Sequence, residues 1–460
     1  MNTQLTSSPQ SVLAELRSAA RGTVIAPSDD GYDETRRLFA GDVDLRPSVI
    51  VRVVDAADVA AVIGVARRTG LELAVRSGGH NTAGHGSTDG GIVIDLRDMK
   101  AIDIDVAGRT AWVETGATAA EVTNATGEHG LAVGFGDTGS VGVGGITLGG
   151  GIGYLVRKHG LTIDSLLAAE VVTADGSILH VDAESHSDLF WAIRGGGGNF
   201  GVATRFRFRL RALPGIVGGI LILPATPHTI AGFMAAAAAA PDELSAIANV
   251  MPAPPMPFLP EDTVGKVVVF ALMTYAGDAE AGERALAPFR ALATPLADLL
   301  RPMPYAEMYP PEDESYRPLA ISRTMFMDTV DGDTAATMLE HLEASDAPLR
   351  VVQLRALGGA IARVPADATA FAHRASRVMA NVASFYTGPD DKPLRAGWVA
   401  SLSAALQQGD DGAYVNFLVD EGEERIRAAY PGATWDRLVE VKRRYDPTNL
   451  FRRNQNIAPA

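Results

Sequence analysis

The 460-residue chain contains no cysteine. Without a thiol it cannot form a disulfide, a thiolate metal site, an iron–sulfur cluster or a cysteine-based catalytic nucleophile. The lack of disulfides does not fix the compartment, because a disulfide-free chain can survive in either redox environment. Any stability and any chemistry must therefore come from other groups.

The sequence also lacks a Lys/Arg-rich run and a long apolar run. Its 55 Asp and Glu against 40 Lys and Arg give a formal net charge of −15 at pH 7. Such a surface repels phosphate backbones and anionic lipids, so broad binding to nucleic acid or to a membrane is not expected. The longest nearly uncharged stretch, 134–156, is too rich in glycine to favour a spanning helix. The N-terminal residues show no secretory pattern, and we expect a cytoplasmic protein.

The first half of the chain alternates strand and helix patterns. Residues 51–76 predict a strand, a helix between Asp55 and Gly70, and a second strand. Turn residues at 107–109 and at Asp175-Gly176 each separate two apolar runs, and both predict β-hairpins. Strands and helices are thus mixed throughout this part.

The pattern changes near Pro214. An Ala-rich helix at 235–240, a strand at 266–275 and a long helix over 277–300 are predicted. The proline-rich passage 301–318 is predicted as a loop, since proline fits poorly inside either regular element. The length is that of two or three domains.

Glycine is concentrated in two clusters. The first, Arg76 to Asn81, directly follows a predicted strand. Glycines there let backbone N–H groups approach an anion, because no Cβ blocks the way. The second, 142–153, is so dense in glycine that a helix or strand interior is not expected. We interpret it as a loop wrapped around an extended cofactor; a purely structural loop is the alternative.

Other motifs of cofactor or metal sites are missing or out of context. Residues 196–201 match GxGxxG, but a predicted helix precedes them and a strand follows, the reverse of a dinucleotide fingerprint. No HExxH, GxxxxGK[ST] or GxSxG occurs. His80 and His85 lie in one loop without carboxylates to complete a metal site, so no metal is expected.

Four long segments, taken together, closely resemble a known family. Residues 75–96, 139–166 and 188–210 are similar to the vanillyl-alcohol-oxidase/PCMH-type FAD-binding domain. Residues 413–459 resemble the C-terminal segment of its berberine-bridge-enzyme-like subgroup. The region between them matches only weakly, through 356–374.

The resemblance implies an α+β fold in which two packed subdomains bind FAD and an antiparallel sheet of a substrate domain covers the flavin. The implied units are an FAD-binding domain at 1–212, a substrate-binding domain at 213–410 and a segment at 411–460 that returns to the FAD domain. The positions implied to hold or line the FAD, the last two at a strand end, are Arg76, Ser77, Gly78, Gly79, His80, Asn81, Thr138, Val141, Gly142, Gly144, Gly145, Gly149, Gly153, Val202, Asn454 and Asn456.

Three positions refine the cofactor expectation. His80 stands where the family attaches FAD covalently through the 8α-methyl carbon, and a neutral imidazole nitrogen has the nucleophilic character this needs. Thr138 occupies the position where many relatives carry a second, cysteinyl link, so a single histidyl bond is expected. Val141 stands at the position thought to control oxygen access, and a small valine there implies an oxidase that uses O2.

The catalytic base is less clear from the resemblance. Sugar and alcohol oxidases of the family commonly have Tyr-x-Asn-Tyr, but this chain reads Tyr414-Val-Asn416-Phe417. Ile152 likewise replaces a tyrosine of many relatives. Tyr414 remains the best candidate for a phenolic base, with a packing role as the alternative. Asn381 is a second candidate to face the substrate.

The resemblance therefore implies an FAD-dependent oxidase that moves a hydride from a small-molecule alcohol or amine to covalent FAD, which O2 reoxidises to give hydrogen peroxide. The apolar Phe417 and Ile152 favour an apolar or amine substrate over a sugar. A flavin-binding homologue with little turnover is the alternative, and a nicotinamide-dependent reductase is disfavoured. The sequence does not indicate an oligomeric state.

Overall fold

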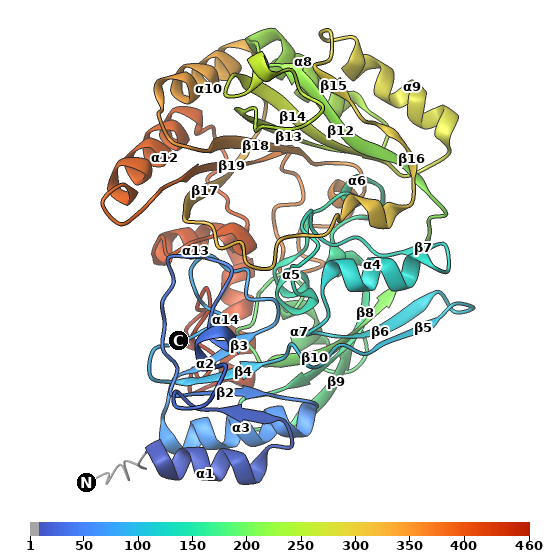
Figure 1. Cartoon of the computed structure of the whole chain (residues 1–460). Helices are drawn as coiled ribbons and strands as arrows, with labels where there is room; N and C mark the ends of the chain where they lie inside the picture. The colour runs from blue at the N-terminus through green and yellow to red at the C-terminus, as the bar shows by residue number, and fades with distance from the viewer. Residues whose placement is uncertain (1–8) are drawn as a thin grey trace.

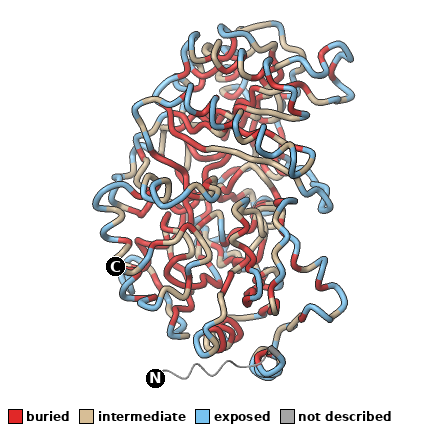
Figure 2. The backbone as a smooth tube through the Cα atoms, turned by 90° about the vertical axis from the view of Figure 1, so that its left-hand side faces the viewer, coloured by how far each residue is buried: buried red, intermediate tan, exposed pale blue. Residues whose placement is uncertain are grey.

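A computed structural model of the chain describes residues 9–460 and contains three main β-sheets. Two of them lie in the lower part of the molecule in Figure 1, and the third lies in the upper part with helices over its outer face. The buried backbone runs through the middle of both parts (Figure 2). No helix among these residues is long and apolar enough to cross a bilayer.

The first sheet has four short strands. In spatial order they are β1 (Thr23–Ile25), β2 (Val49–Arg52), β4 (Ile92–Asp95) and β3 (Leu73–Arg76). Only β1 is antiparallel to its neighbour. The predicted helix connects β2 to β3 as α3 (Ala56–Thr69), capped by the Asp55 side chain and ended by Gly70 in the left-handed conformation (φ 70°). This part of the prediction is confirmed.

The second sheet is a five-stranded antiparallel sheet. In spatial order its strands are β5 (Ile102–Asp105), β6 (Thr110–Glu114), β10 (Val202–Arg209), β8 (Leu166–Val172) and β9 (Ile178–Asp182). Both predicted hairpins are present, as β5–β6 and β8–β9. Two helices pack in its core, α4 (Ala119–Gly127) and α7 (Ser187–Ala192).

The third sheet has eight antiparallel strands. They are, across the sheet, β15 (Ala297–Asp298), β12 (Ile216–Pro224), β14 (Val267–Tyr275), β13 (Leu244–Pro252), β18 (Arg350–Ala356), β19 (Val378–Phe385) and β17 (Ala320–Met327), with β16 (Arg301–Met303) also paired to β12. Four helices cover its outer face in Figure 1: α8 (Pro227–Ala239), α9 (Ala279–Arg290), α10 (Gly332–Ala344) and α12 (Lys392–Leu406). Their apolar side chains form one core with the strands.

The long helix predicted over 277–300 is wrong in its second half. The helix ends at Arg290, and the chain then forms the edge strands β15 and β16. Pro295 prevents a helix from continuing through Thr294, because proline lacks the N–H that a helix needs and disfavours helical conformation in the residue before it. The passage predicted as a loop, 301–318, contains β16 and one 3-10 turn at Tyr305–Met308 before it becomes irregular.

The C-terminal segment returns from the third sheet to the lower part. It comprises a 3-10 turn at Val415–Phe417, α13 (Glu423–Ala429) and α14 (Ala433–Tyr445). α14 packs against α7, and the fully buried Lys442 donates hydrogen bonds to the carbonyls of Asn199 and Phe451. Lys442 also pairs with the equally buried Asp446 at 2.7 Å. Its bond to Asn199 joins the tail to the loop before β10.

The remaining elements are short. They are α1 (Pro9–Ala19), α2 (Tyr32–Thr35), β7 (Leu131–Ala132), α5 (Val143–Gly149), α6 (Val156–His159), a 3-10 turn at Thr162–Ser165, β11 (Arg211–Ala212), a 3-10 turn at Glu261–Thr263 and α11 (Ala360–Arg363).

Candidate active site

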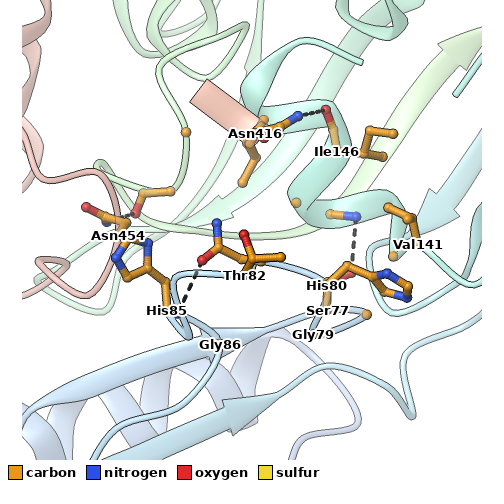
Figure 3. Close-up of a pocket in the computed structure, with 18 of the residues that line it drawn as sticks. Ser77, Gly79, His80, Thr82, His85, Gly86, Val141, Ile146, Asn416 and Asn454 are labelled. Atoms are coloured by element: carbon orange, nitrogen blue, oxygen red, sulfur yellow. Dashed lines mark hydrogen bonds between the residues drawn. The ribbon is translucent and has the colours of Figure 1, made fainter. Parts of the chain in front are cut away.

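A cavity of about 500 Å³ is lined by residues of all three sheets and of the C-terminal segment. Figure 3 shows His80 and Val141 at one side of it and His85 and Asn454 at the other. Residues 76–86, 136–148 and 197–203 form the floor, and the roof comes from β17 and β19 of the third sheet. We use "floor" and "roof" in this sense below.

The floor begins where β3 ends. Arg76 is 1% exposed and pairs with the buried Asp95 at 2.8 Å. Burial lowers the pKa of Arg76 to about 10, although Asp95 favours the charged form, so the guanidinium stays positive at neutral pH. The ion pair fixes the start of the loop that carries Ser77 to Asn81.

Two backbone segments cross in direct contact at Gly78 and Gly142. A Cβ on Gly142 would lie 2.1 Å from the Gly78 nitrogen, and one on Gly78 would lie 2.3 Å from the Gly142 nitrogen. The Ser77 hydroxyl fixes the crossing, since it donates to the Thr115 carbonyl and accepts from the Gly144 N–H at 3.2 Å. Only glycine permits this approach.

The glycine run 142–153 is partly a helix, so the prediction that it forms only a loop is wrong. Its first half is α5. The helix ends at Gly150 and Gly151, whose φ values of 131° and 84° suit glycine alone. Gly149 is in the helix for a packing reason, because a Cβ there would lie 2.0 Å from the Asn416 side-chain oxygen. These glycines permit tight packing as well as access.

Two glycines of the floor face empty space instead. A Cβ on Gly145 or Gly198 would meet no atom within 4 Å, and both residues line the cavity. Asn381 in the roof and Asn454 in the tail each have a buried side-chain oxygen without a hydrogen-bond partner among residues 9–460. A ligand that rests on bare backbone and offers N–H or O–H donors suits both features. FAD is such a ligand, so the residues present fit it.

His80 lies in the wall of the cavity. Its ring stacks on Phe39 with centroids 4.4 Å apart, and its Nε2 lies 3.1 Å from the Ser140 hydroxyl. Burial lowers the pKa of His80 to about 4, with Glu312 opposing and Arg317 adding to the effect. The imidazole is therefore neutral over the physiological pH range.

Tyr414, near the start of the C-terminal segment, contacts the glycine run after α5. It is 2% exposed, and its hydroxyl accepts hydrogen bonds from the Gly151 N–H at 2.8 Å and from the Asn416 amide at 2.9 Å. Burial raises the pKa of Tyr414 although both donors lower it. The phenol keeps its proton at neutral pH. Phe417 lies beside it, under the Arg355 guanidinium at 5.3 Å.

Most of the predicted site residues meet in this cavity. Both catalytic candidates, Tyr414 and Asn381, line it. The predicted cofactor positions that line it are Arg76, Ser77, Gly78, Gly79, His80, Asn81, Thr138, Val141, Gly142, Gly144, Gly145, Val202 and Asn454.

Three predicted positions do not line the cavity: Gly149, Gly153 and Asn456. Gly153 packs against backbone, since a Cβ there would lie 1.9 Å from the Phe135 carbonyl oxygen. The segment that contains Asn456 is irregular, so the expected strand end is wrong. After α14 the chain forms hydrogen bonds with the loop before β10, and it pairs with no strand among residues 9–460.

Sequence reasoning also missed several residues of the site. Phe39, Tyr316, Ser322 and Arg453 line the cavity, and Glu312 contacts its edge through Ser140. Phe39, Tyr316, Ser322 and Glu312 belong to no contiguous motif and reach the cavity only through the tertiary fold. Arg453 lies within the C-terminal motif 413–459, where the sequence alone does not single it out. His85, which we considered only as a metal ligand, lines the cavity beside Asn81.

Comparison with known proteins agrees with this geometry. Residues 47–182 match the family described as FAD binding domain, and residues 413–458 match the family described as berberine and berberine like. The chain is 31% identical over 456 residues to (R)-6-hydroxynicotine oxidase of Paenarthrobacter nicotinovorans, covering 95% of this chain and 97% of that protein. An FAD-linked oxidoreductase of Dictyostelium discoideum is 30% identical, covering 97% of each chain.

Among solved structures, 6-hydroxy-D-nicotine oxidase from Arthrobacter nicotinovorans superposes with a TM-score of 0.85 at 28% identity, covering 96% of this chain and 98% of that chain. Chitooligosaccharide oxidase has the same fold, with a TM-score of 0.84 at 22% identity. These findings define the class of the protein as an FAD-dependent oxidoreductase with an α+β fold. The chain belongs to the family of FAD-linked oxidases that end in a berberine-bridge-like segment.

Proposed function

We propose that the chain carries FAD on His80 and oxidises a small-molecule alcohol or amine, with O2 as the final electron acceptor. The observation that carries this proposal is His80 itself: a desolvated imidazole with a pKa of about 4 in the wall of a glycine-lined cavity. A neutral imidazole is a nucleophile, whereas a protonated one is not. Thr138 offers no thiol, so the attachment is a single histidyl bond.

The floor holds the cofactor in this proposal. FAD, when bound, supplies the hydride acceptor and the two-electron route to O2. We assign Arg76 to Asn81 and residues 142–145 to the pyrophosphate and the ring, and Val202 and Asn454 to the adjoining walls. Gly149, Gly153 and Asn456 shape the floor without lining it. Val141, a small side chain in the cavity wall, leaves O2 a path to the flavin.

The substrate lies between the floor and the roof. Tyr414 keeps its proton at neutral pH, so it orients a substrate through its hydroxyl more readily than it accepts a proton. Ile152 and Phe417 add apolar surface where many relatives have tyrosine. A neutral amine releases a hydride without a base, whereas an alcohol must also lose its hydroxyl proton. These features favour an amine or apolar substrate over a free sugar.

The order of the sheets along the chain supports separate cofactor-binding and substrate-binding parts. All strands of the first two sheets lie before residue 213, and all strands of the third lie between 216 and 385. We propose residues 1–212 as the FAD-binding domain, 213–410 as the substrate-binding domain and 411–460 as the segment that completes the FAD site.

The first experiment is mass spectrometry of the denatured protein, with the flavin-bearing peptide sequenced. We expect one FAD mass on His80 and none on the His80→Ala chain. An unmodified wild-type chain that releases its flavin on denaturation would contradict the covalent link. Oxygen uptake with matched panels of amines, alcohols and free sugars then tests the substrate class, and turnover of free sugars alone would contradict our preference for amines.

A second candidate function is a flavin-binding protein with little turnover, favoured by the missing tyrosine at Phe417. Photoreduction followed by air separates the two. The flavin of an oxidase regains its oxidised spectrum when O2 is admitted. A flavin that stays reduced in air, or that no compound of the substrate panels reduces, supports the second candidate.

A further inference from the structure

A segment of the upper part of the molecule reaches down to the edge of the floor beside His80. It runs from Tyr309 to Pro318, between the 3-10 turn at Tyr305–Met308 and β17. Near its middle, Glu312 accepts hydrogen bonds from the backbone N–H groups of Gly139 at 2.7 Å and Ser140 at 3.2 Å. Its second carboxylate oxygen accepts a hydrogen bond from the Ser140 hydroxyl. The carboxylate is thus held by three donors of one short loop.

These contacts determine which nitrogen of His80 carries the proton. A serine hydroxyl has one hydrogen, and an ionised carboxylate can only accept, so the Ser140 hydrogen points to Glu312. Toward His80, the Ser140 oxygen must then be an acceptor. The His80 Nε2 that lies 3.1 Å away therefore carries the proton and donates it.

The other ring nitrogen is left with a free lone pair. His80 Nδ1 makes no hydrogen bond within residues 9–460, and His80 lines the cavity. The Phe39 ring, parallel to the imidazole within 20°, fixes the ring plane. The side chain is therefore held in one tautomer, in one plane, with one nitrogen available to a ligand.

We propose that Ser140 and Glu312 are positioning residues for the attachment of FAD: they hold His80 in the tautomer in which Nδ1 bonds to the flavin and receive the Nε2 proton as the bond forms. The proposal rests on the covalent link to His80 proposed above. It adds two residues, one of them from the substrate-binding part of the chain, to a step that the sequence motif attributes to one histidine.

The chemistry balances with O2 as oxidant. Attachment replaces one C–H bond of the flavin 8α-methyl group with a C–N bond to His80, and the methyl carbon and the imidazole each lose one hydrogen. The two electrons and two protons released reduce one O2 to hydrogen peroxide by way of the flavin. The imidazole hydrogen is the one on Nε2, because Nδ1 forms the new bond. It leaves through Ser140 toward Glu312, whose negative charge favours its departure.

The test compares the rate of attachment in matched variants. Protein produced under riboflavin limitation is incubated with FAD in air, and the share of chains that retain FAD after denaturation is followed by intact mass. FAD bound before denaturation is measured by absorbance. We expect Glu312→Gln and Ser140→Ala to bind FAD as the wild type does and to attach it about 100-fold more slowly, which is the low end of the effect of losing acid–base assistance.

Two further variants separate this role from a structural one. Ser140→Thr keeps the hydroxyl, so we expect a rate within about twofold of the wild type, whereas a merely structural site gives no reason for such a rescue. Glu314→Gln removes a neighbouring exposed carboxylate of the same segment and should leave the rate unchanged. NMR of the isolated histidyl-flavin should show the bond at Nδ1.

The outcomes distinguish this inference from the function it rests on. A wild-type chain without covalent FAD overturns the attachment and the relay together. A wild-type chain that attaches FAD, with Glu312→Gln or Ser140→Ala attaching it equally fast, overturns the relay alone, as does a bond at Nε2.

Discussion

The floor and the roof of the cavity differ in what they present to a ligand: the floor presents mainly backbone, and the roof presents side chains. The floor uses backbone: Gly78 and Gly142 cross in contact, and Gly145 leaves bare peptide facing the cavity. The roof uses side chains, such as Ser322 of β17 and Asn381 of β19. The two strands are paired, and the residues of each that line the cavity lie at alternate positions. Backbone contacts suit a cofactor that the whole family shares, whereas side chains can change without altering the strands.

The two layers are joined by a buried ion pair. Arg355, on β18 beside the roof strand β19, is 3% exposed and reaches Asp137 of the floor at 2.6 Å. The same guanidinium donates a hydrogen bond to the Ile152 carbonyl at 3.3 Å. The comparison predicts that substitutions at the tightly packed positions of the floor reduce stability and cofactor binding together. Substitutions in the roof should alter substrate use with little effect on stability.

The largest effect is expected at the tail that closes the floor. Lys442→Met leaves the Asp446 carboxylate buried without its ion-pair partner, and loss of one partner of a buried pair costs about 3–5 kcal/mol. We expect the free energy of unfolding, from urea titration, to fall by that amount. Arg443→Met, an exposed position of the same helix, is the control and should change it by less than about 0.5 kcal/mol. Equal effects of the two would contradict the role of the buried pair.

A pair of glycine substitutions tests the floor itself. Gly142→Ala forces a Cβ against the Gly78 backbone, and we expect a loss of about 1–3 kcal/mol in stability together with weaker FAD binding. Gly145→Ala meets no protein atom, so it should leave the stability of the FAD-free chain unchanged and weaken only FAD binding. Thermal unfolding with and without FAD separates the two. A stable Gly142→Ala chain would argue against the tight crossing.

The roof should respond in the opposite way. Asn381→Ala removes a cavity-facing acceptor, and loss of one hydrogen bond of about 1 kcal/mol predicts about a fivefold fall in kcat/KM. Asn249→Ala, on the same sheet, removes an amide that bonds to Gln353 and the Phe270 carbonyl outside the cavity. We expect it to lower the melting temperature and leave kcat/KM unchanged. The reverse pattern would show that Asn381 is structural.

The smallest change is expected with pH. The pKa of His80 is about 4, so the imidazole keeps its lone pair from pH 8 down to about 5 and loses it only as the pH falls through 4. The rate of FAD attachment should be nearly flat between pH 6 and 8. An exposed histidine, with a pKa of about 6.5, would lose most of its rate below pH 6. A midpoint near 6.5 would show that His80 is not desolvated.

The same contrast explains what the sequence could predict. The floor comes from contiguous sequence motifs, so the sequence alone predicts Arg76 to Asn81, Val141 and Val202 as site residues. The conformation of these motifs was harder to predict. The run 142–153 contains α5 despite the low helix propensity of glycine, and Gly149 in it packs closely against Asn416. The expected strand at Asn454 to Asn456 is absent, since its partners are loop carbonyls and side chains.

The residues that were missed have no local signal. Phe39 and Glu312 are separated from His80 by long stretches of chain, and only the packed sheets bring them to it. Asn381, by contrast, was found through a weak match and lies in the cavity on β19. A single sequence shows that a strand exists more readily than which of its faces will meet a ligand.

The return of the C-terminal segment has a consequence for how the protein is made. The strands of the first two sheets are synthesised before the C-terminal residues that contact the loops between them. These later residues include Tyr414, Lys442 and Asn454. Until then, the apolar patch that receives Leu438 and Val441 of α14 is open to water. The nascent protein must therefore wait for residues 414–454 before its cavity is complete, and during that interval it presents the kind of surface that chaperones recognise.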